Sequence, residues 1–422
     1  MPDTQLTMLT LENPFTQALR KLLPEFEHRS GIRIKLIGVP YDDLLAQLNL
    51  IGPHFTYDMI RIDVAQFGDI GQSIYRPLDE LSISPEGLSP RLIKNGYDSY
   101  SMLNGRVYAL PLDPSVQIFL YRTDLFHDAK LCRAYYERFH ENLVVPTTYE
   151  QYLHAAEFFT RSCNPDSPTE YGTTMTCGSA SVAASDFLPF YLSRIDRFGS
   201  TPETLRLDSP EMQAAMRQYH ALEKFSCKQN WWGDSIQKFA EGKTAMTVIY
   251  SNYAAELINS GNSVVVGRVG AAILPGCKPL LGGGIVGISR YSPKAEACKQ
   301  FFHWYYSADV ASLLVRLGGT SPIVDAYEDF QNYSIFPWMN TSKKSFGLGQ
   351  RGVINQTPER FSIPKYEFAV GTAVRNVVQD LMTPEDASRM AQAVLPVRSL
   401  ASPLARVQPA FPAQAGGPEP TP

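Results

Sequence analysis

Aromatic and amide side chains gather between residues 231 and 257, and their types suit the binding of a flat ligand. This stretch carries Trp231, Trp232, Tyr250 and Tyr253, with Ser251 and Asn252 beside them. Aromatic rings at strand ends stack on a ligand face, while nearby amides and hydroxyls fix its orientation. A single ring is more often part of the core, but the cluster as a whole indicates a binding site.

A helix, a tight turn, a buried strand and a second helix are expected to position this cluster. Gly233-Asp234-Ser235 offers a helix N-cap, followed by apolar residues at helical spacing. Gly242 ends that helix, because glycine tolerates the left-handed conformation of a helix end. The apolar run Ala245–Tyr250 suits a buried strand. Ser251-Asn252 then caps a predicted helix up to Asn259.

Polar residues also follow two predicted strands near the N-terminus. The strands Leu6–Leu11, Ile32–Val39 and Tyr57–Asp63 alternate with helical segments, which predicts a parallel sheet covered on both faces. Ligands bind such sheets at the carboxyl ends of the strands. Asn13 and Asp63 lie there, so both are site candidates, although Asp63 suits equally well the N-cap of the next short helix.

A crossover between two lobes is predicted after the Asn104-Gly105 hairpin turn. The segment Pro111–Ser115 is expected to interrupt a strand that resumes over Val116–Tyr121. Asp113 and Ser115 would then lie at a hinge and face the cleft. A simple turn is the alternative, because Asp, Pro and Ser are common turn residues.

The glycine-rich segment Gly282–Gly287 matches the spacing of a dinucleotide-binding loop, but its context does not. The glycines precede a predicted strand, Ile285–Ser289, and no helix follows them directly. We therefore expect Gly283 and Gly284 to let the backbone approach a ligand or another strand closely.

The composition is that of a soluble globular protein large enough for two lobes. The chain has 422 residues, with 44% hydrophobic and 19% charged residues and a net charge of −4. No basic patch stands out, which argues against nucleic acid as the main partner. No apolar run approaches the ~20 residues of a membrane span.

Metal and cofactor motifs are missing from the sequence, so neither a metal nor a cofactor is expected. The seven histidines are scattered, and the six cysteines form no CxxC pair. Isolated buried thiols are the favoured interpretation of the cysteines, which leans towards a reducing compartment. The first residues do not have the pattern of an export signal. Either a signal has been removed, or the protein is not exported.

The segment FAEGKTAMTVIYSNYAAEL resembles the hallmark segment of the extracellular solute-binding proteins of ABC importers, in the sugar-binding, maltose-binding-protein-like group. In that family a helix, a glycine turn and a strand of the form GKxAM lead to an aromatic residue that faces the ligand. Five further segments resemble the family in the same order, and together they cover roughly residues 6–395. They are LTLENPFTQALRKLLPEFEHRSGIRIKLIGVPYDDL, YDMIRIDVAQF, LNGRVYALPLDPSVQIFLYRTDLF, VPTTYEQYLHAAEFFTR and LLGGGIVGISRYSPKAEACKQFFHWY.

The resemblance implies the two-lobed α/β fold of type II periplasmic binding proteins, with three crossovers and a ligand cleft between the lobes. Residues 1–112 and 275–318 would form the N-terminal lobe, and residues 113–274 and 319–395 the C-terminal lobe. Residues 396–422 are expected to be a disordered tail, because they are rich in Pro, Ala and Gly. The implied ligand-binding residues are Asn13, Asp63, Asp113, Ser115, Trp231, Trp232, Ser251, Asn252, Tyr253, Gly283 and Gly284.

The resemblance further implies a monomer that captures a mono- or oligosaccharide by hinge closure and delivers it to an ABC-transporter permease outside the cytoplasm. Two alternatives remain open at this point. Similar modules occur in cytoplasmic winged-helix regulators, where the same cleft senses a sugar. A glycosidase would need two carboxylates, for which Asp63 and Asp113 are the candidates, but nothing in the sequence places either in an apolar pocket.

Overall fold

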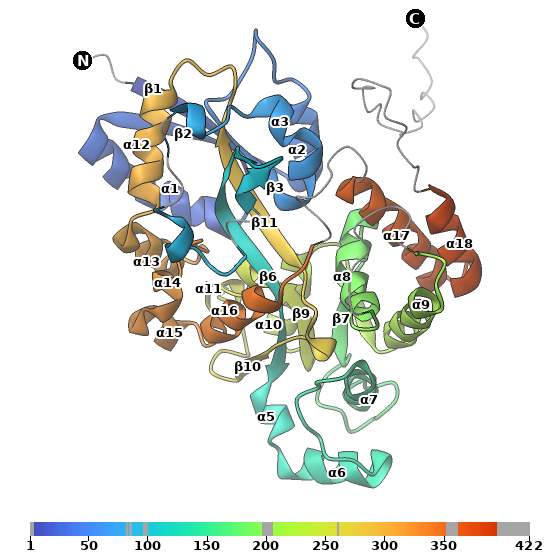
Figure 1. Ribbon diagram of the computed structural model, residues 1–422. Coiled ribbons are helices and arrows are strands. Elements are labelled where there is room, and N and C mark those ends of the chain that lie inside the picture. Colours follow the sequence, from blue (N-terminus) through green and yellow to red (C-terminus); the bar gives the residue numbers. More distant parts are fainter. Residues whose placement is uncertain are drawn as a thin grey trace, which may run out of the picture.

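The computed structural model describes residues 4–81, 83, 87–95, 100–195, 206–259, 261–351 and 362–394, and they form a two-lobed α/β protein (Figure 1). The strands are β1 (Thr4–Leu11), β2 (Ile32–Val39), β3 (Met59–Asp63), β4 (Met102–Leu103), β5 (Arg106–Val107), β6 (Leu110–Arg122), β7 (Thr173–Thr176), β8 (Ser226–Gln229), β9 (Met246–Tyr250), β10 (Val269–Ala272) and β11 (Leu281–Ile288). The longer helices are α1 (Pro14–Ser30), α2 (Tyr41–Leu48), α3 (Phe67–Ile74), α6 (Ala129–Phe139), α7 (Tyr149–Phe158), α8 (Ala180–Leu192), α9 (Pro210–Glu223), α10 (Trp232–Ala240), α12 (Ala295–Tyr305), α13 (Ala308–Arg316), α16 (Met339–Leu348), α17 (Ile363–Val378) and α18 (Pro384–Val394). Short helical turns are α5 (Thr123–Phe126), α11 (Glu256–Asn259), α14 (Asp325–Glu328) and α15 (Phe330–Ile335). The predicted tail, 396–422, lies outside the described residues.

The central sheet has the order β10-β6-β11-β3-β1-β2, and β9 also pairs with β6. The predicted parallel arrangement is confirmed for β1, β2 and β3, where β1 pairs with both neighbours in parallel. Strand β11 joins β3 and β6 in antiparallel register. In the first lobe α1 and α12 lie on one side of the sheet, with α2 and α3 on the other (Figure 1).

Strand β6 carries the chain from the first lobe to the second. It pairs with β11 from Leu110 to Val116 and with β9 from Gln117 onward. The predicted break at Pro111–Ser115 is wrong, because β6 is continuous from Leu110 to Arg122. Instead, the register shifts between Gly284 and Ile285 of β11, which is a β-bulge. The hydroxyls of Tyr306 and Tyr305 donate to the carbonyls of Pro111 and Leu112 at this bulge, so these carbonyls stay hydrogen-bonded.

The second lobe combines β9, β10 and the lower part of β6 with a helical layer. Helix α17 packs against α8 and α18, and these helices lie together with α9 beside β7 (Figure 1). The predicted start of one helix in this lobe is wrong. Helix α10 begins at Trp232 rather than after Gly233-Asp234-Ser235, and Asp234 accepts a hydrogen bond from the backbone N–H of Trp231. Helix α7 begins with a capping box formed by Thr148 and Gln151.

Candidate ligand-binding site

Two adjoining cavities lie where the lobes meet. The inner cavity has a volume of about 50 Å³ and is lined by Leu11, Tyr41, Arg61, Asp63, Ser181, Val182, Ser185, Trp231, Trp232, Tyr250, Asn252, Tyr253, Gly282, Gly283 and Arg351. The outer cavity has a volume of about 480 Å³ and is lined by Leu11, Glu12, Pro40, Tyr41, Gly178, Ser179, Val182, Asn230, Trp231 and Tyr253. Both linings combine residues from the first and second lobes, and five residues belong to both cavities.

Aromatic rings form the boundary between the two cavities. Tyr41, the first residue of α2, contacts Trp231 across the lobes with ring centroids 5.2 Å apart. The indole Nε1 of Trp231 donates a 2.8 Å hydrogen bond to the hydroxyl of Tyr253. Trp232 packs edge-on against Tyr250 at 5.1 Å. The sequence cluster of aromatic residues therefore does assemble at one place, where it lines a cavity.

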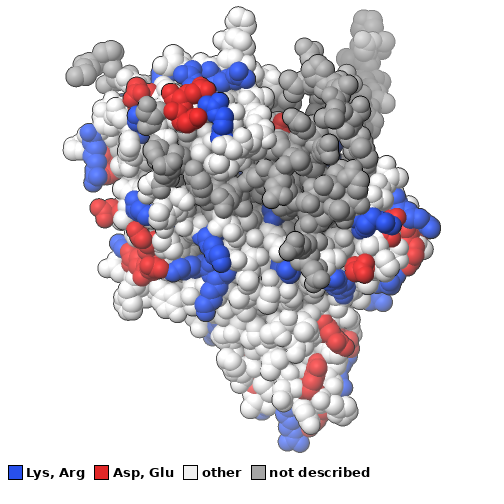
Figure 2. Space-filling model, viewed as in Figure 1, with Lys and Arg blue, Asp and Glu red and all other residues white. Residues whose placement is uncertain are grey.

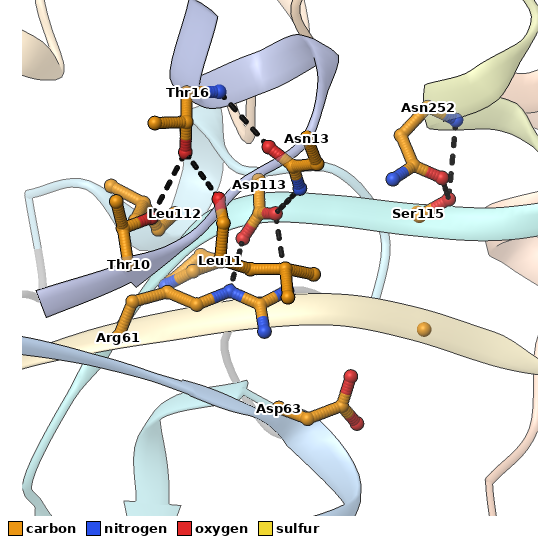
Figure 3. A network of polar contacts seen from close by, with 12 residues as sticks. Thr10, Leu11, Asn13, Thr16, Arg61, Asp63, Leu112, Asp113, Ser115 and Asn252 are labelled. Carbon is orange, nitrogen blue, oxygen red and sulfur yellow. Dashed lines mark hydrogen bonds and ion pairs between the residues drawn. The ribbon is translucent and has the colours of Figure 1, made fainter. Parts of the chain in front are cut away.

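A buried ion pair at the inner cavity joins strands β3 and β6 of the central sheet (Figure 3). Arg61 on β3 donates from Nε and Nη2 to the two carboxylate oxygens of Asp113 on β6, both at 3.1 Å. Asn13 donates to the same carboxylate at 3.0 Å and also caps α1, since its Oδ1 accepts from the Thr16 N–H. Burial lowers the pKa of Arg61, but attraction to Asp113 and Asp63 outweighs it and raises that pKa above its usual range.

A second arginine, Arg351, lies on the other side of the inner cavity. Its Nη2 donates to Glu367 at 3.0 Å and lies 3.9 Å from Asp63, while Nη1 donates to the hydroxyl of Tyr250 and the carbonyl of Leu281. Burial raises the pKa of Glu367, although the nearby Arg351 opposes this rise. Asp63 also caps the turn after β3, because it accepts a 2.9 Å bond from the Ala65 N–H. The predicted cap is therefore confirmed, and the same carboxylate faces the cavity.

Ser115 and Asn252 link the crossover strand to the loop after β9. The Ser115 hydroxyl donates to Asn252 Oδ1 at 2.8 Å, and the Asn252 N–H donates back to Ser115 at 3.3 Å (Figure 3). The Val116 N–H donates to the Ser251 hydroxyl. Ser251 and Asn252 therefore do not cap the following helix as predicted. Their side chains bond across to β6 instead, since the 3-10 turn at 251–253 directs them there.

Three consecutive glycines of β11, Gly282 to Gly284, make room for this network. They lie inside the strand rather than before it, which corrects the predicted strand start. A Cβ on Gly284 would overlap Arg61 and Asp113, and one on Gly282 would overlap the Tyr250 ring. Gly283 has φ of +85° and lies against the Asp113 carbonyl. The close approach expected from the sequence is thus an approach to strand β6 and to side chains of the site.

The described part of the chain contains no metal site, no disulfide and no membrane-spanning helix. No cluster of His, Cys, Asp and Glu there could hold a metal ion. All six cysteines are described, and none forms a disulfide. Within the same residues, every helix is too short or too polar to cross a membrane. On the face in Figure 2, acidic and basic side chains are interspersed.

Comparison with known proteins identifies the family. The family model of the bacterial extracellular solute-binding proteins matches residues 21–338, which is most of the chain. The chain belongs to this family.

Solved structures share the fold of this solute-binding protein over most of its length. An ABC-transporter solute-binding protein from Agrobacterium radiobacter K84, in complex with ribitol, is similar at a TM-score of 0.79 and 23% identity, covering 93% of this chain and 98% of that one. One from Agrobacterium vitis S4, with bound D-mannitol, has a TM-score of 0.73 and 20% identity, with 93% and 97% covered. Maltose-bound MalE3 of T. maritima has a TM-score of 0.75 and 19% identity, with 93% and 99% covered. The predicted two-lobed fold is confirmed by these matches.

The predicted site residues of this solute-binding protein fall into two layers. Six of them line the inner cavity: Asp63, Trp231, Trp232, Asn252, Tyr253 and Gly283. Asn13, Asp113, Ser115 and Gly284 lie behind that wall and hold it through hydrogen bonds or close packing. Ser251 borders a separate cavity of about 20 Å³. That these eleven residues contact a ligand stays a prediction.

Tyr41, Arg61 and Arg351 also line the inner cavity, although they were not among the residues expected from the sequence. Tyr41 lies two residues after the last residue of β2, so the rule that places Asp63 at a strand end also indicates Tyr41. Arg61 is a basic residue between two isoleucines of the buried strand Met59–Asp63, and a charge in such a place must be paired when buried. Arg351 gives no such indication, because it lies in irregular chain whose path depends on the whole fold.

Proposed function

We propose that this solute-binding protein captures a carbohydrate between its lobes and delivers it to an ABC importer. The observation that carries the proposal is the interlobe cavity itself, which combines aromatic rings with buried amide, carboxylate and guanidinium groups. Rings pack on the apolar faces of sugars, while the polar groups exchange hydrogen bonds with hydroxyls. The sugars and sugar alcohols bound in the similar structures add support, since they belong to this chemical class.

Binding is proposed to work by closure of the lobes. Tyr41 and Asp63 come from the first lobe, and Trp231 and Asn252 come from the second. A ligand between them contacts both lobes only in the closed form, so it shifts the population towards closure. The proposed lobes are residues 1–112 with 275–318, and residues 113–274 with 319–395. The change of partners along β6 supports a hinge near Val116.

The ligand is proposed to leave unchanged, since Asp113, one of the two candidate carboxylates, does not suit hydrolysis. Both oxygens of Asp113 are occupied by Arg61 and Asn13 in a fully buried position. A glycosidase needs one carboxylic acid to give its proton to the scissile bond and a second carboxylate beside it. Asp113 is held as the partner of a cation, which favours binding over catalysis.

The proposed partner is a permease of the ABC type, and the proposed location is outside the cytoplasm, in line with the family. A thermal-shift screen against mono- and oligosaccharides and sugar alcohols tests the function. A ligand at 100 times its Kd stabilises the folded state by about 2.7 kcal/mol, which raises Tm by a few degrees. If none of these carbohydrates raises Tm, the proposed function is wrong.

A second candidate, a cytoplasmic sugar sensor, is favoured by one observation. The six cysteines are unpaired, as is usual for proteins of reducing compartments. The cleft chemistry would be the same in both cases. Fractionation of the source cells distinguishes the two candidate functions. An importer component would be found outside the cytoplasmic membrane, and a sensor would be found in the cytoplasm.

A further inference from the structure

Two buried arginines of the inner cavity each keep an N–H group without a hydrogen-bond partner among the described residues. These groups are Nη1 of Arg61 and Nε of Arg351. In Figure 3 the free nitrogen of Arg61 points away from Asp113, to the side where Asp63 lies. Buried donors are almost always paired. An unpaired donor on a residue that lines a cavity therefore indicates a ligand oxygen as its partner.

The charged groups around the inner cavity provide no excess positive charge that could neutralise an acidic ligand. Arg61 is paired with Asp113, and Arg351 is paired with Glu367 and lies near Asp63. Two positive charges thus face three carboxyl groups, and the other polar lining residues are neutral. The carboxylate or phosphate of an acidic ligand would lie near Asp63, and no unpaired cation would be there to neutralise it. A hydroxyl suits the same place, because it accepts from a guanidinium and donates to a carboxylate.

The inner cavity is also small. Its volume of about 50 Å³ is room for about three to five water molecules at 10–15 Å³ each. The hydroxyls of one sugar unit replace a similar number of waters. The way to the outer cavity passes Tyr41 and Trp231, whose rings are in contact. A second sugar unit would have to occupy the space in which these rings meet.

Resting on the proposed function, we propose that the inner cavity selects a neutral ligand of a single sugar unit, either a monosaccharide or an open-chain polyol. Arg61 and Arg351 donate hydrogen bonds to its hydroxyls, and the Tyr41–Trp231 contact limits its length. The selection is therefore by charge and by size, and each depends on a different pair of residues.

Calorimetric titration of the full chain at pH 7 tests the selection with matched ligands. The set contains aldohexoses, pentitols and hexitols, the uronic acids of the same hexoses, and di- and trisaccharides built from them. We expect at least one neutral single-unit ligand to bind about 100-fold more tightly than its uronic acid and its disaccharide. Equal or tighter binding of a uronic acid or an oligosaccharide would overturn the inference and leave carbohydrate binding intact. If no member binds, the proposed function itself fails.

Two variants test separately the size limit set by the Tyr41–Trp231 contact and the hydrogen bond donated by Arg351. Tyr41→Ala opens the boundary between the cavities, so the preference for one unit over its disaccharide should fall at least tenfold, while Tyr41→Phe keeps the ring and the preference. Arg351→Lys keeps the charge but removes Nε, and should weaken binding of the preferred ligand about tenfold. Tyr136→Ala, at an exposed position of α6, is the control. If Arg351→Lys does not fold, Arg61→Lys replaces it. Unchanged selectivity in Tyr41→Ala and unchanged affinity in the lysine variant would contradict the assignment.

Discussion

Arg61 and Asp113 form a two-point ion pair in the centre of the molecule, and each side chain is 1% exposed. The pair joins β3 to the crossover strand β6, with β11 between them. Removing one partner leaves the other charge buried and unpaired, which costs about 3–5 kcal/mol. Asp113→Ala should therefore lower the free energy of unfolding by about this amount in urea denaturation.

The control for this prediction is the exposed pair Arg133–Glu137 on α6. Glu137→Ala should leave the unfolding midpoint nearly unchanged, because exposed pairs contribute little. Similar losses in Asp113→Ala and Glu137→Ala would mean that the buried pair does not have the structural role given to it.

Gly283 should tolerate no side chain. Its φ of +85° is unfavourable for other residues, and a Cβ would overlap the Asp113 carbonyl. Gly105 provides the matched case, since its φ is +75° and a Cβ there meets nothing within 4 Å. Gly105→Ala should cost about 1 kcal/mol from backbone strain alone, as judged by thermal melting. Gly283→Ala should cost clearly more, or give no soluble protein; equal costs would argue against the close contact between β11 and β6.

Asn252 is expected to contact the ligand directly and to be oriented by Ser115. Asn252→Ala should weaken sugar binding about tenfold, which corresponds to about 1.4 kcal/mol for a lost hydrogen bond. Ser115→Ala should have a smaller effect, because it only frees the amide to rotate. Calorimetric titration of both variants checks this order. A larger loss in Ser115→Ala would show that the hydroxyl, and not the amide, meets the ligand.

Asp186 on α8 makes the stability of the second lobe depend on pH. Its Oδ2 accepts from the Tyr219 hydroxyl at 2.7 Å and from the Thr176 N–H at 3.2 Å. Burial raises its pKa to about 7, against the opposing effect of these hydrogen bonds. A pKa raised by folding means that the stabilisation is complete below about pH 4 and is lost as the pH rises through 7.

Asp186→Asn keeps an acceptor oxygen at this position and removes the titration. The Tm of the natural protein should therefore fall relative to that of the variant between pH 4 and pH 8. Asp166→Asn, at an exposed position, should follow the natural protein throughout. A constant difference in Tm between the natural protein and Asp186→Asn across this range would contradict the raised pKa.

The sequence predicts the parts of this fold that depend on local patterns. The strands β1 to β3, the helix cap by Asp63 and the turn at Gly242 follow from spacing, capping and glycine preferences. The place of Asp63 also follows from the sequence, because the alternation of strands and helices puts it at the carboxyl edge of the sheet. These features are decided within a few residues, or by the direction of a strand.

The features that the sequence did not predict depend on partners far along the chain. Pro111 and Pro114 suggested a broken strand, but pairing with the glycines of β11 and a bulge keep β6 continuous. Ser251 and Asn252 have the residue types of a helix cap, yet β6 offers them hydrogen bonds instead. Arg351 reaches the cavity only because the chain returns there after α16. Such choices between local and distant partners are made by the tertiary structure.

A crystal structure of the protein with its preferred sugar would locate the ligand. We predict one sugar unit in the inner cavity, with hydroxyls at hydrogen-bond distance from Asp63 and Asn252 and with Tyr41 and Trp231 closed over it. A sugar bound outside the Tyr41–Trp231 contact, or away from the junction of the lobes, would show that the inner cavity is not the binding site.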